Sequence, residues 1–339
     1  MMNDSPDKPS YIDRLRDSSF SIKISPLDDD SPIQDAISIG ERLIIVKDKG
    51  IYEIFLADRI DPKRINPSVP NTFQRLLPFG AQDAWVGAVV LTAHKFFLSS
   101  CFDPKIGSSA FNFLLGVAQD IAGAKAILQR YLQQEAEAQK SVNPIIRHER
   151  SFVLPSISNV EASCNEFLQC MCHAQRELFE IVLLFYPDVR TGLWDGFKAK
   201  IDAGPQDLDN FPQLLAEYTE FLKQIRNARN CVEHPKFEQK LVVSDFKLNA
   251  DNVLVGPMIE VVHPKTPMVA CPIGEFFTNT IESMVIIVEC MVVSLCARNV
   301  GKHGGLQLHA MMLAPEQRKF AHVRYSYGIL HNGKLVPLS

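Results

Sequence analysis

This chain lacks an excess of positive charge. Its 339 residues include 35 Lys and Arg against 39 Asp and Glu, which gives a formal net charge of -4 at pH 7. A strongly basic balance is the electrostatic footprint of proteins that bind nucleic acid over a broad surface. The composition excludes that class and leaves local basic patches as candidate phosphate sites. One such patch is the C-terminal segment after Glu289, where a role beside a phosphate backbone and plain surface charge both stay open.

The chain also lacks a long uninterrupted apolar run. The longest run, residues 284–297, contains Glu289 and is shorter than the about 20 residues that cross a bilayer, so it predicts a core helix. The first residues have neither a basic start nor an apolar stretch after it, and no secretory signal is expected. These absences predict a cytoplasmic protein with no membrane segment.

Features of metal and cofactor sites are sparse. Eight cysteines need no disulfide framework in an intracellular chain of this length. Cys164, Cys170, Cys172 and His173 fall within one expected helix, at spacings that scatter them around its axis, and zinc pairs usually lie in turns. Buried cysteines are the better interpretation. With no Walker loop and no GxGxxG motif, we expect no metal ion and no cofactor.

Periodicity predicts a mainly α protein with β additions, an α+β fold. Four regions are expected: a poorly ordered lead-in at residues 1–38 with a short strand at 20–24, an N-terminal α+β region of unknown function at 39–145, a helical domain at 151–300 with a β-insertion at 239–263, and a C-terminal β segment at 301–339. The second region begins with a β-hairpin of residues 42–46 and 51–56, followed by a proline-rich loop. Pro144 and Pro155 place a domain boundary at 141–156.

The apolar spacing further predicts several helices. They are expected at residues 82–99, 109–140, 160–185, 191–201, 211–231 and from Pro272 onward. Strands within the insertion are expected at residues 241–246, 253–255 and 258–262, and C-terminal strands at 306–311 and 322–329.

One arginine occupies a position where the helical pattern calls for an apolar residue. The apolar positions of the helix at 211–231 recur at three- and four-residue steps: Leu215, Tyr218, Leu222 and Ile225. Arg229 is next, and because a guanidinium is costly to bury alone, it suggests a carboxylate partner, a subunit interface or a bound phosphate. His234 precedes Pro235, whose ring disfavours helical dihedrals at the histidine. A helix end there allows Arg229 and His234 to converge on one ligand.

Arg229, Asn230 and His234 resemble the signature of the HEPN superfamily, in which an arginine, a small polar residue and, after a short spacer, a histidine follow one another. The resemblance covers roughly residues 151–300 and implies a helical bundle. It implies a homodimeric, metal-independent endoribonuclease that acts on RNA in a shared Arg/His cleft, in a stress or defence setting. Other members of the superfamily are non-catalytic modules that bind RNA, nucleotide or a protein partner. An antitoxin or regulatory protein is a further partner that the resemblance suggests.

The resemblance assigns roles to these three residues. His234 suits proton transfer because its ordinary pKa lies near neutrality. Arg229 suits phosphate binding because its planar guanidinium can bind two phosphate oxygens. Asn230 is expected to orient the imidazole or to form a hydrogen bond with the ribose. Flanking cations are expected to attract RNA: Lys223, Arg226, Lys236 and Lys240. The alternative is purely structural, with Arg229 paired to Glu233 and His234 an ordinary helix-end residue.

Overall fold

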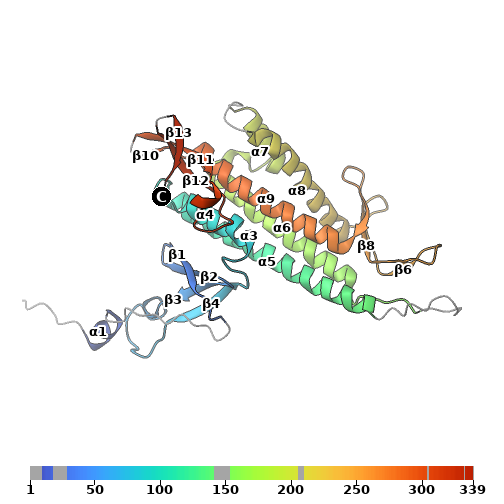
Figure 1. Cartoon of the computed structure of the whole chain (residues 1–339), viewed down its shortest axis with the longest axis horizontal. Coiled ribbons are helices and arrows are strands. Elements are labelled where there is room, and N and C mark those ends of the chain that lie inside the picture. Colours follow the sequence, from blue (N-terminus) through green and yellow to red (C-terminus); the bar gives the residue numbers. More distant parts are fainter. Residues whose placement is uncertain are drawn as a thin grey trace, which may run out of the picture. The chain divides into compact units, whose positions relative to one another are not determined.

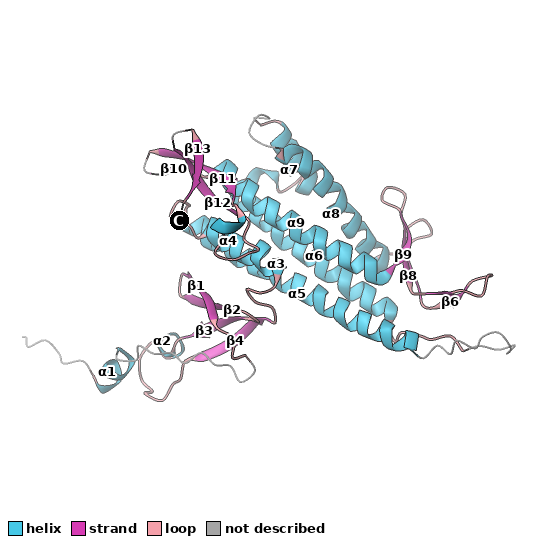
Figure 2. Cartoon of the chain, viewed as in Figure 1, coloured by secondary structure: helices cyan, strands magenta, loops and turns pink. Residues whose placement is uncertain are grey.

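The computed structural model describes residues 10–17, 29–140, 153–204, 210–303, 305–331 and 333–338, and it contains both helices and antiparallel sheets, as an α+β fold requires (Figures 1 and 2). The chain forms two compact units, Met1–Val86 and Gly87–Ser339. The boundary expected at residues 141–156 lies largely outside the described residues, and the units divide elsewhere because α5 (Pro104–Lys140) packs along α6 (Val160–Phe185). Proline and charge content does not reveal such packing.

The first unit contains a four-stranded antiparallel sheet in the order β1-β2-β3-β4. Its strands are β1 (Ile33–Ile39), β2 (Arg42–Lys47), β3 (Ile51–Phe55) and β4 (Thr72–Leu77). The expected hairpin is confirmed, since β2 pairs with β3. Two expectations were wrong: β1 forms within the supposed lead-in, where it buries Ile37 and Ile39, and β4 forms within the supposed proline-rich loop. The strand expected at residues 20–24 lies outside the described residues.

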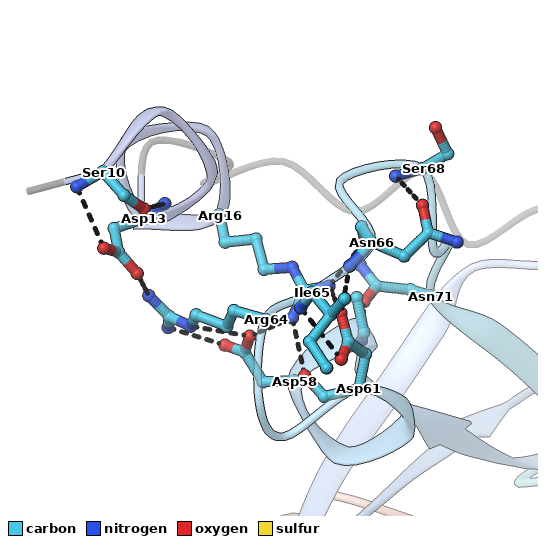
Figure 3. Close-up of polar contacts among 11 residues, drawn as sticks. Ser10, Asp13, Arg16, Asp58, Asp61, Arg64, Ile65, Asn66, Ser68 and Asn71 are labelled. Carbon is cyan, nitrogen blue, oxygen red and sulfur yellow. Dashed lines mark hydrogen bonds and ion pairs between the residues drawn. The ribbon is translucent and has the colours of Figure 1, made fainter.

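The first unit also contains two short helices, α1 (Tyr11–Asp17) and α2 (Ala57–Ile60), joined by ion pairs (Figure 3). Arg16 binds Asp58 at 2.7 Å and Asp61 at 3.0 Å. Arg64 binds Asp13 of α1 at 2.7 Å and Asp58 at 3.0 Å. Polar contacts therefore attach α1 both to α2 and to the segment that follows it.

The second unit is a helical bundle. Its helical segments are the π-helix η1 (Gly87–Leu91), α4 (Thr92–Phe97), α5, α6, the 3-10 helix η2 (Pro187–Val189), α7 (Leu193–Asp202), α8 (Phe211–Glu233), α9 (Ile273–Asn299) and the 3-10 helix η3 (Pro315–Gln317); the three-residue α3 (Ala84–Val86) precedes them. The expected helices are confirmed, with ends shifted by a few residues. α6 packs against α5, α8 and α9, and Phe167 of α6 stacks on Phe277 of α9 with ring centroids 4.0 Å apart.

Small sheets complete the second unit. A three-stranded sheet beside α8 and α9 consists of β5 (Lys240–Ser244), β8 (Met258–Val262) and β9 (Met268–Pro272). A two-stranded sheet consists of β6 (Lys247–Leu248) and β7 (Leu254–Val255). A C-terminal four-stranded sheet consists of β10 (Lys302–His303), β11 (Leu306–Met312), β12 (Tyr325–His331) and β13 (Lys334–Pro337). The insertion is longer than expected, because β9 closes the sheet beyond residue 263. β11 contacts α9, so the C-terminal sheet is part of the bundle's fold.

α5 and α9 are long and apolar enough to cross a membrane by length and composition alone. Both pack within the bundle, and 50% and 56% of their apolar windows are buried there. This burial is the packing expected of the core helix at residues 284–297. Among the described residues, no group of three or more His, Cys, Asp or Glu side chains is arranged to hold a metal ion.

Candidate functional site

α8 ends at Glu233, directly before His234 and Pro235, as expected for the residue that precedes a proline. The helix runs to Glu233, and His234 has φ -133° and ψ 61°, outside the helical region. The N–H of His234 donates to the carbonyl oxygen of Asn230 at 2.9 Å, which closes the last turn. The imidazole of His234 is exposed. The predicted helix end at His234 is therefore confirmed.

Arg229 has the carboxylate partner that its position suggested. Its guanidinium forms an ion pair with Glu233, one turn further along α8, and the Arg229 side chain is 27% exposed. The guanidinium is thus neither sealed in the core nor fully in solvent. Glu233 neutralises part of its charge, and the remaining hydrogen-bond donors of the planar fork are left for a ligand.

Arg229 also lines a cavity of about 270 Å³ between α6, α7 and α8, which we call the arginine pocket. Its lining residues come from all three helices: Cys172, Gln175, Arg176 and Phe179 from α6, Leu193 and Trp194 from α7, and Arg226, Arg229 and Asn230 from α8. Three of these side chains are cationic and none is a carboxylate. Within the described part of the chain, neither Arg176 nor Arg226 forms an ion pair.

The wall of the arginine pocket is held by packing and one buried hydrogen bond. The side-chain amide of Gln175 donates to the carbonyl oxygen of Leu222 at 2.9 Å, which fixes α6 against α8. Phe179 and Trp194 meet edge to face, with centroids 5.0 Å apart. Burial raises the pKa of the Cys172 thiol to about 11, so this cysteine is neutral at pH 7 and is not a nucleophile.

This arrangement suits an anionic ligand. Guanidinium groups bind phosphate oxygens in planar, bidentate geometry and stay charged at every working pH. Among the described residues, Glu233 forms an ion pair with one of the three arginines, and the side chains that line the pocket carry a net positive charge even though the whole chain is acidic. A phosphate or another oxyanion is the ligand that these side chains would stabilise.

The structure brings some of the expected site residues together and leaves others apart. Arg226, Arg229 and Asn230 line one pocket, whereas His234 does not line it. Lys223 is bound by Asp195 at 2.7 Å and Glu220 at 2.9 Å, outside the pocket.

Lys236 and Lys240 lie beyond the end of α8. Lys236 is held by a backbone bridge to Gln239, and Lys240 begins β5 with an exposed side chain. Of the expected site residues, the pocket therefore includes those in the last two turns of α8 and none from the segment that follows.

Sequence reasoning missed the contribution of α6. Cys172, Gln175, Arg176 and Phe179 recur at three- and four-residue steps, so they share one face of a helix. That spacing was a usable signal. It could not reveal that this face meets α8, because the pairing of helix faces depends on the tertiary packing.

Comparisons with known proteins add no relative: no protein-family model matches this chain, and neither a curated protein nor a solved structure matches it. The HEPN resemblance therefore depends on Arg229, Asn230 and His234 and on the helices around them. The chemistry of the arginine pocket is the main guide to function.

Proposed function

We propose that this chain is a HEPN-like protein that binds RNA through the arginine pocket and that, as a homodimer, cleaves it as a metal-independent endoribonuclease. The single observation behind this proposal is the convergence of three guanidinium groups from two helices on a cavity of about 270 Å³ that no carboxylate lines. A phosphate group bound there gains charge-assisted hydrogen bonds.

RNA is favoured over a free phosphate ion because the pocket also has apolar and amide walls. Phe179 and Trp194, each 5% exposed, form an apolar wall behind the arginines, and the bases of single-stranded RNA stack on arginine planes as well as on aromatic rings. Asn230 adds a side-chain amide that can bind a ribose hydroxyl or a base edge. Together these groups match a phosphate and its attached nucleoside.

Cleavage needs a group that moves protons between the ribose 2'-hydroxyl and the leaving 5'-oxygen. No histidine lines the arginine pocket, and the exposed His234 lies one turn beyond Asn230. In a homodimer, His234 of one protomer would act on RNA held by the arginines of both protomers, because histidine is the side-chain type best suited to proton transfer near neutral pH. Dimerisation is therefore part of the proposal.

RNA binding is tested by fluorescence anisotropy with a labelled single-stranded RNA. Arg176→Gln, Arg226→Gln and Arg229→Gln should each weaken binding by about tenfold, since a hydrogen bond to a charged group contributes about 1.5–3 kcal/mol. The matched control is Arg130→Gln, whose side chain is 53% exposed and paired with Glu166 away from the pocket. Unchanged affinity in the triple variant would overturn the proposal.

RNA cleavage is tested in EDTA with the purified full chain. Loss of activity by about 100-fold or more in His234→Ala, with folding retained, supports the nuclease, since general acid–base catalysis contributes about 10²–10⁴-fold. His309→Ala, on an exposed position of β11, is the control. Equal activity in all preparations indicates contamination. Binding without cleavage in all of them favours the second candidate, a non-catalytic RNA-binding module, which the absence of a histidine from the pocket lining supports.

A further inference from the structure

A second cavity lies on the other side of α8. It has a volume of about 240 Å³ and is enclosed by α8, the first turns of α9 and strands β8 and β9. Successive helical residues are rotated by about 100°, so Gln224 and Ala228, which line this cavity, face away from Arg226 and Arg229. The two cavities are separate sites, and nothing below depends on RNA binding.

The second cavity has an apolar floor. Ile225, Val261 and Phe276 are buried there and come from α8, β8 and α9 respectively. Phe221 adds a second, half-buried aromatic ring from α8. The floor therefore suits the hydrocarbon or aromatic body of a small molecule.

The rim of the cavity is polar and follows one side of α9. Glu275, Asn279 and Ser283 are spaced four residues apart, so they form a row on the same face of the helix. Glu275 lies in the first turn of α9, where the helix dipole favours a negative charge. We call this cavity the Glu275 pocket.

The charge of the Glu275 pocket is opposite to that of the arginine pocket. Among the described residues that line it, Glu275 is the one charged side chain, and none is a Lys, Arg or His. Cys271 lines the same cavity as Glu275, and burial, followed by the negative charge of Glu275, raises the pKa of its thiol. A phosphate or carboxylate ligand would meet repulsion there and find no cationic side chain.

We propose that the Glu275 pocket binds a small protonated amine with an apolar or aromatic body. The ammonium group pairs with the Glu275 carboxylate and donates a hydrogen bond to the side-chain oxygen of Asn279. The body lies over Phe221 and Phe276, whose ring faces also attract a cation. An acidic rim above an aromatic floor selects this chemistry over neutral and anionic molecules.

The test uses three probes of similar shape and different charge: 2-phenylethylamine, 2-phenylethanol and 3-phenylpropanoate. Affinity is measured by calorimetry on the full chain, and occupancy by the protection of Cys271 from alkylation, mapped by mass spectrometry. The half-buried Cys170, which lies between α5 and α6, is the internal control thiol. The amine should bind about tenfold more tightly than the alcohol and protect Cys271 alone, and the propanoate should not bind.

Two variants separate charge recognition from general apolar binding. Glu275→Gln keeps the shape of the side chain and should weaken amine binding about fivefold, toward the affinity of the alcohol. Glu282→Gln changes the same charge on an exposed position of α9 outside the pocket and should change nothing. The proposal is overturned if the amine fails to protect Cys271 at millimolar concentration, if the propanoate binds as well as the amine, or if Glu275→Gln binds the amine as the parent does. Thermal melts verify that both variants fold.

Discussion

At the scale of the residue, Arg229 explains why a charged side chain can continue an apolar stripe. Its aliphatic stem covers apolar surface, while its guanidinium reaches both Glu233 and the arginine pocket. The ion pair lowers the cost of partial burial, but it also competes with any anionic ligand for the same donors. Glu233 therefore sets how much positive charge the pocket presents.

Replacing Glu233 tests this competition. Glu233→Gln removes the opposing charge and should raise RNA affinity about threefold at low salt, a change that corresponds to a partly exposed ion pair of about 0.6 kcal/mol. Glu217→Gln, an exposed position of α8 outside the pocket, makes the same change in net charge and should have little effect. Anisotropy titrations of the two variants provide the comparison. A lower affinity in Glu233→Gln would mean that Glu233 positions Arg229 and does not compete with the ligand.

Glu289 is a second residue that binds an arginine side chain. Its side chain is 0% exposed within α9, and Arg324, which precedes β12, binds it with Nε 3.1 Å from Oε1. Arg324→Ala should destabilise the fold by about 3 kcal/mol, because it leaves a buried carboxylate without its counter-charge.

Urea denaturation measures this cost. Lys334→Ala, at an exposed position of β13, is the control for loss of a positive charge. The double variant Arg324→Met with Glu289→Met should recover part of the stability, because it removes both charges. A single variant as stable as the parent chain would contradict the idea that the buried Glu289 carboxylate depends on Arg324.

At the scale of the element, the helices could be predicted from the sequence and several strands could not. Regular apolar spacing predicts α6 and α8, and Pro235 predicts the end of α8. β4 and β9 were missed because prolines at their ends resemble loop signals, and β1 was missed because the acidic segment before it suggests disorder. The part of the site on α8, which includes Arg226 and Arg229, could be predicted because it lies on a helix that the sequence predicts. Arg176 could not be predicted, since no local sequence feature indicates which face of α6 packs against α8.

The attachment of α1 should depend on pH. Hydrogen bonds from Arg64 and Ser10 lower the pKa of Asp13 to about 2, and the pKa values of Asp58 and Asp61 are lowered as well. A lowered folded-state pKa means that the stabilisation is complete above the ordinary value of 3.8 and is lost as the pH falls toward 2. We therefore expect α1 to detach between about pH 4 and pH 2.

NMR titration of the Asp13 carboxyl and of the α1 amides measures this detachment. Arg64→Gln should return the Asp13 titration toward its ordinary range and release α1 at a higher pH. High salt at neutral pH should loosen α1 as well, because the ion pairs of Arg64 with Asp13 and Asp58, drawn in Figure 3, are partly exposed to solvent. An Asp13 titration at the ordinary value in the parent chain would contradict the network.

At the scale of the whole molecule, the net charge of -4 means that the proposed attraction of RNA must come from a local patch and not from the overall charge. If three arginines neutralise three phosphates, the slope of log affinity against log salt for a single strand should be about -2, at about -0.7 per phosphate. Each Arg→Gln change in the pocket should reduce the slope by about 0.7. Titrations at several salt concentrations measure it. A slope that stays unchanged in the triple variant would assign the contacts to another surface.

α8 forms a wall of both the arginine pocket and the Glu275 pocket. If each pocket binds its proposed ligand, a shift of α8 caused by one ligand would change the affinity for the other, and thermodynamic reciprocity makes the two changes in binding free energy equal. Under these two proposals, an amine in the Glu275 pocket is an effector of an anion in the arginine pocket, and α8 connects the two sites.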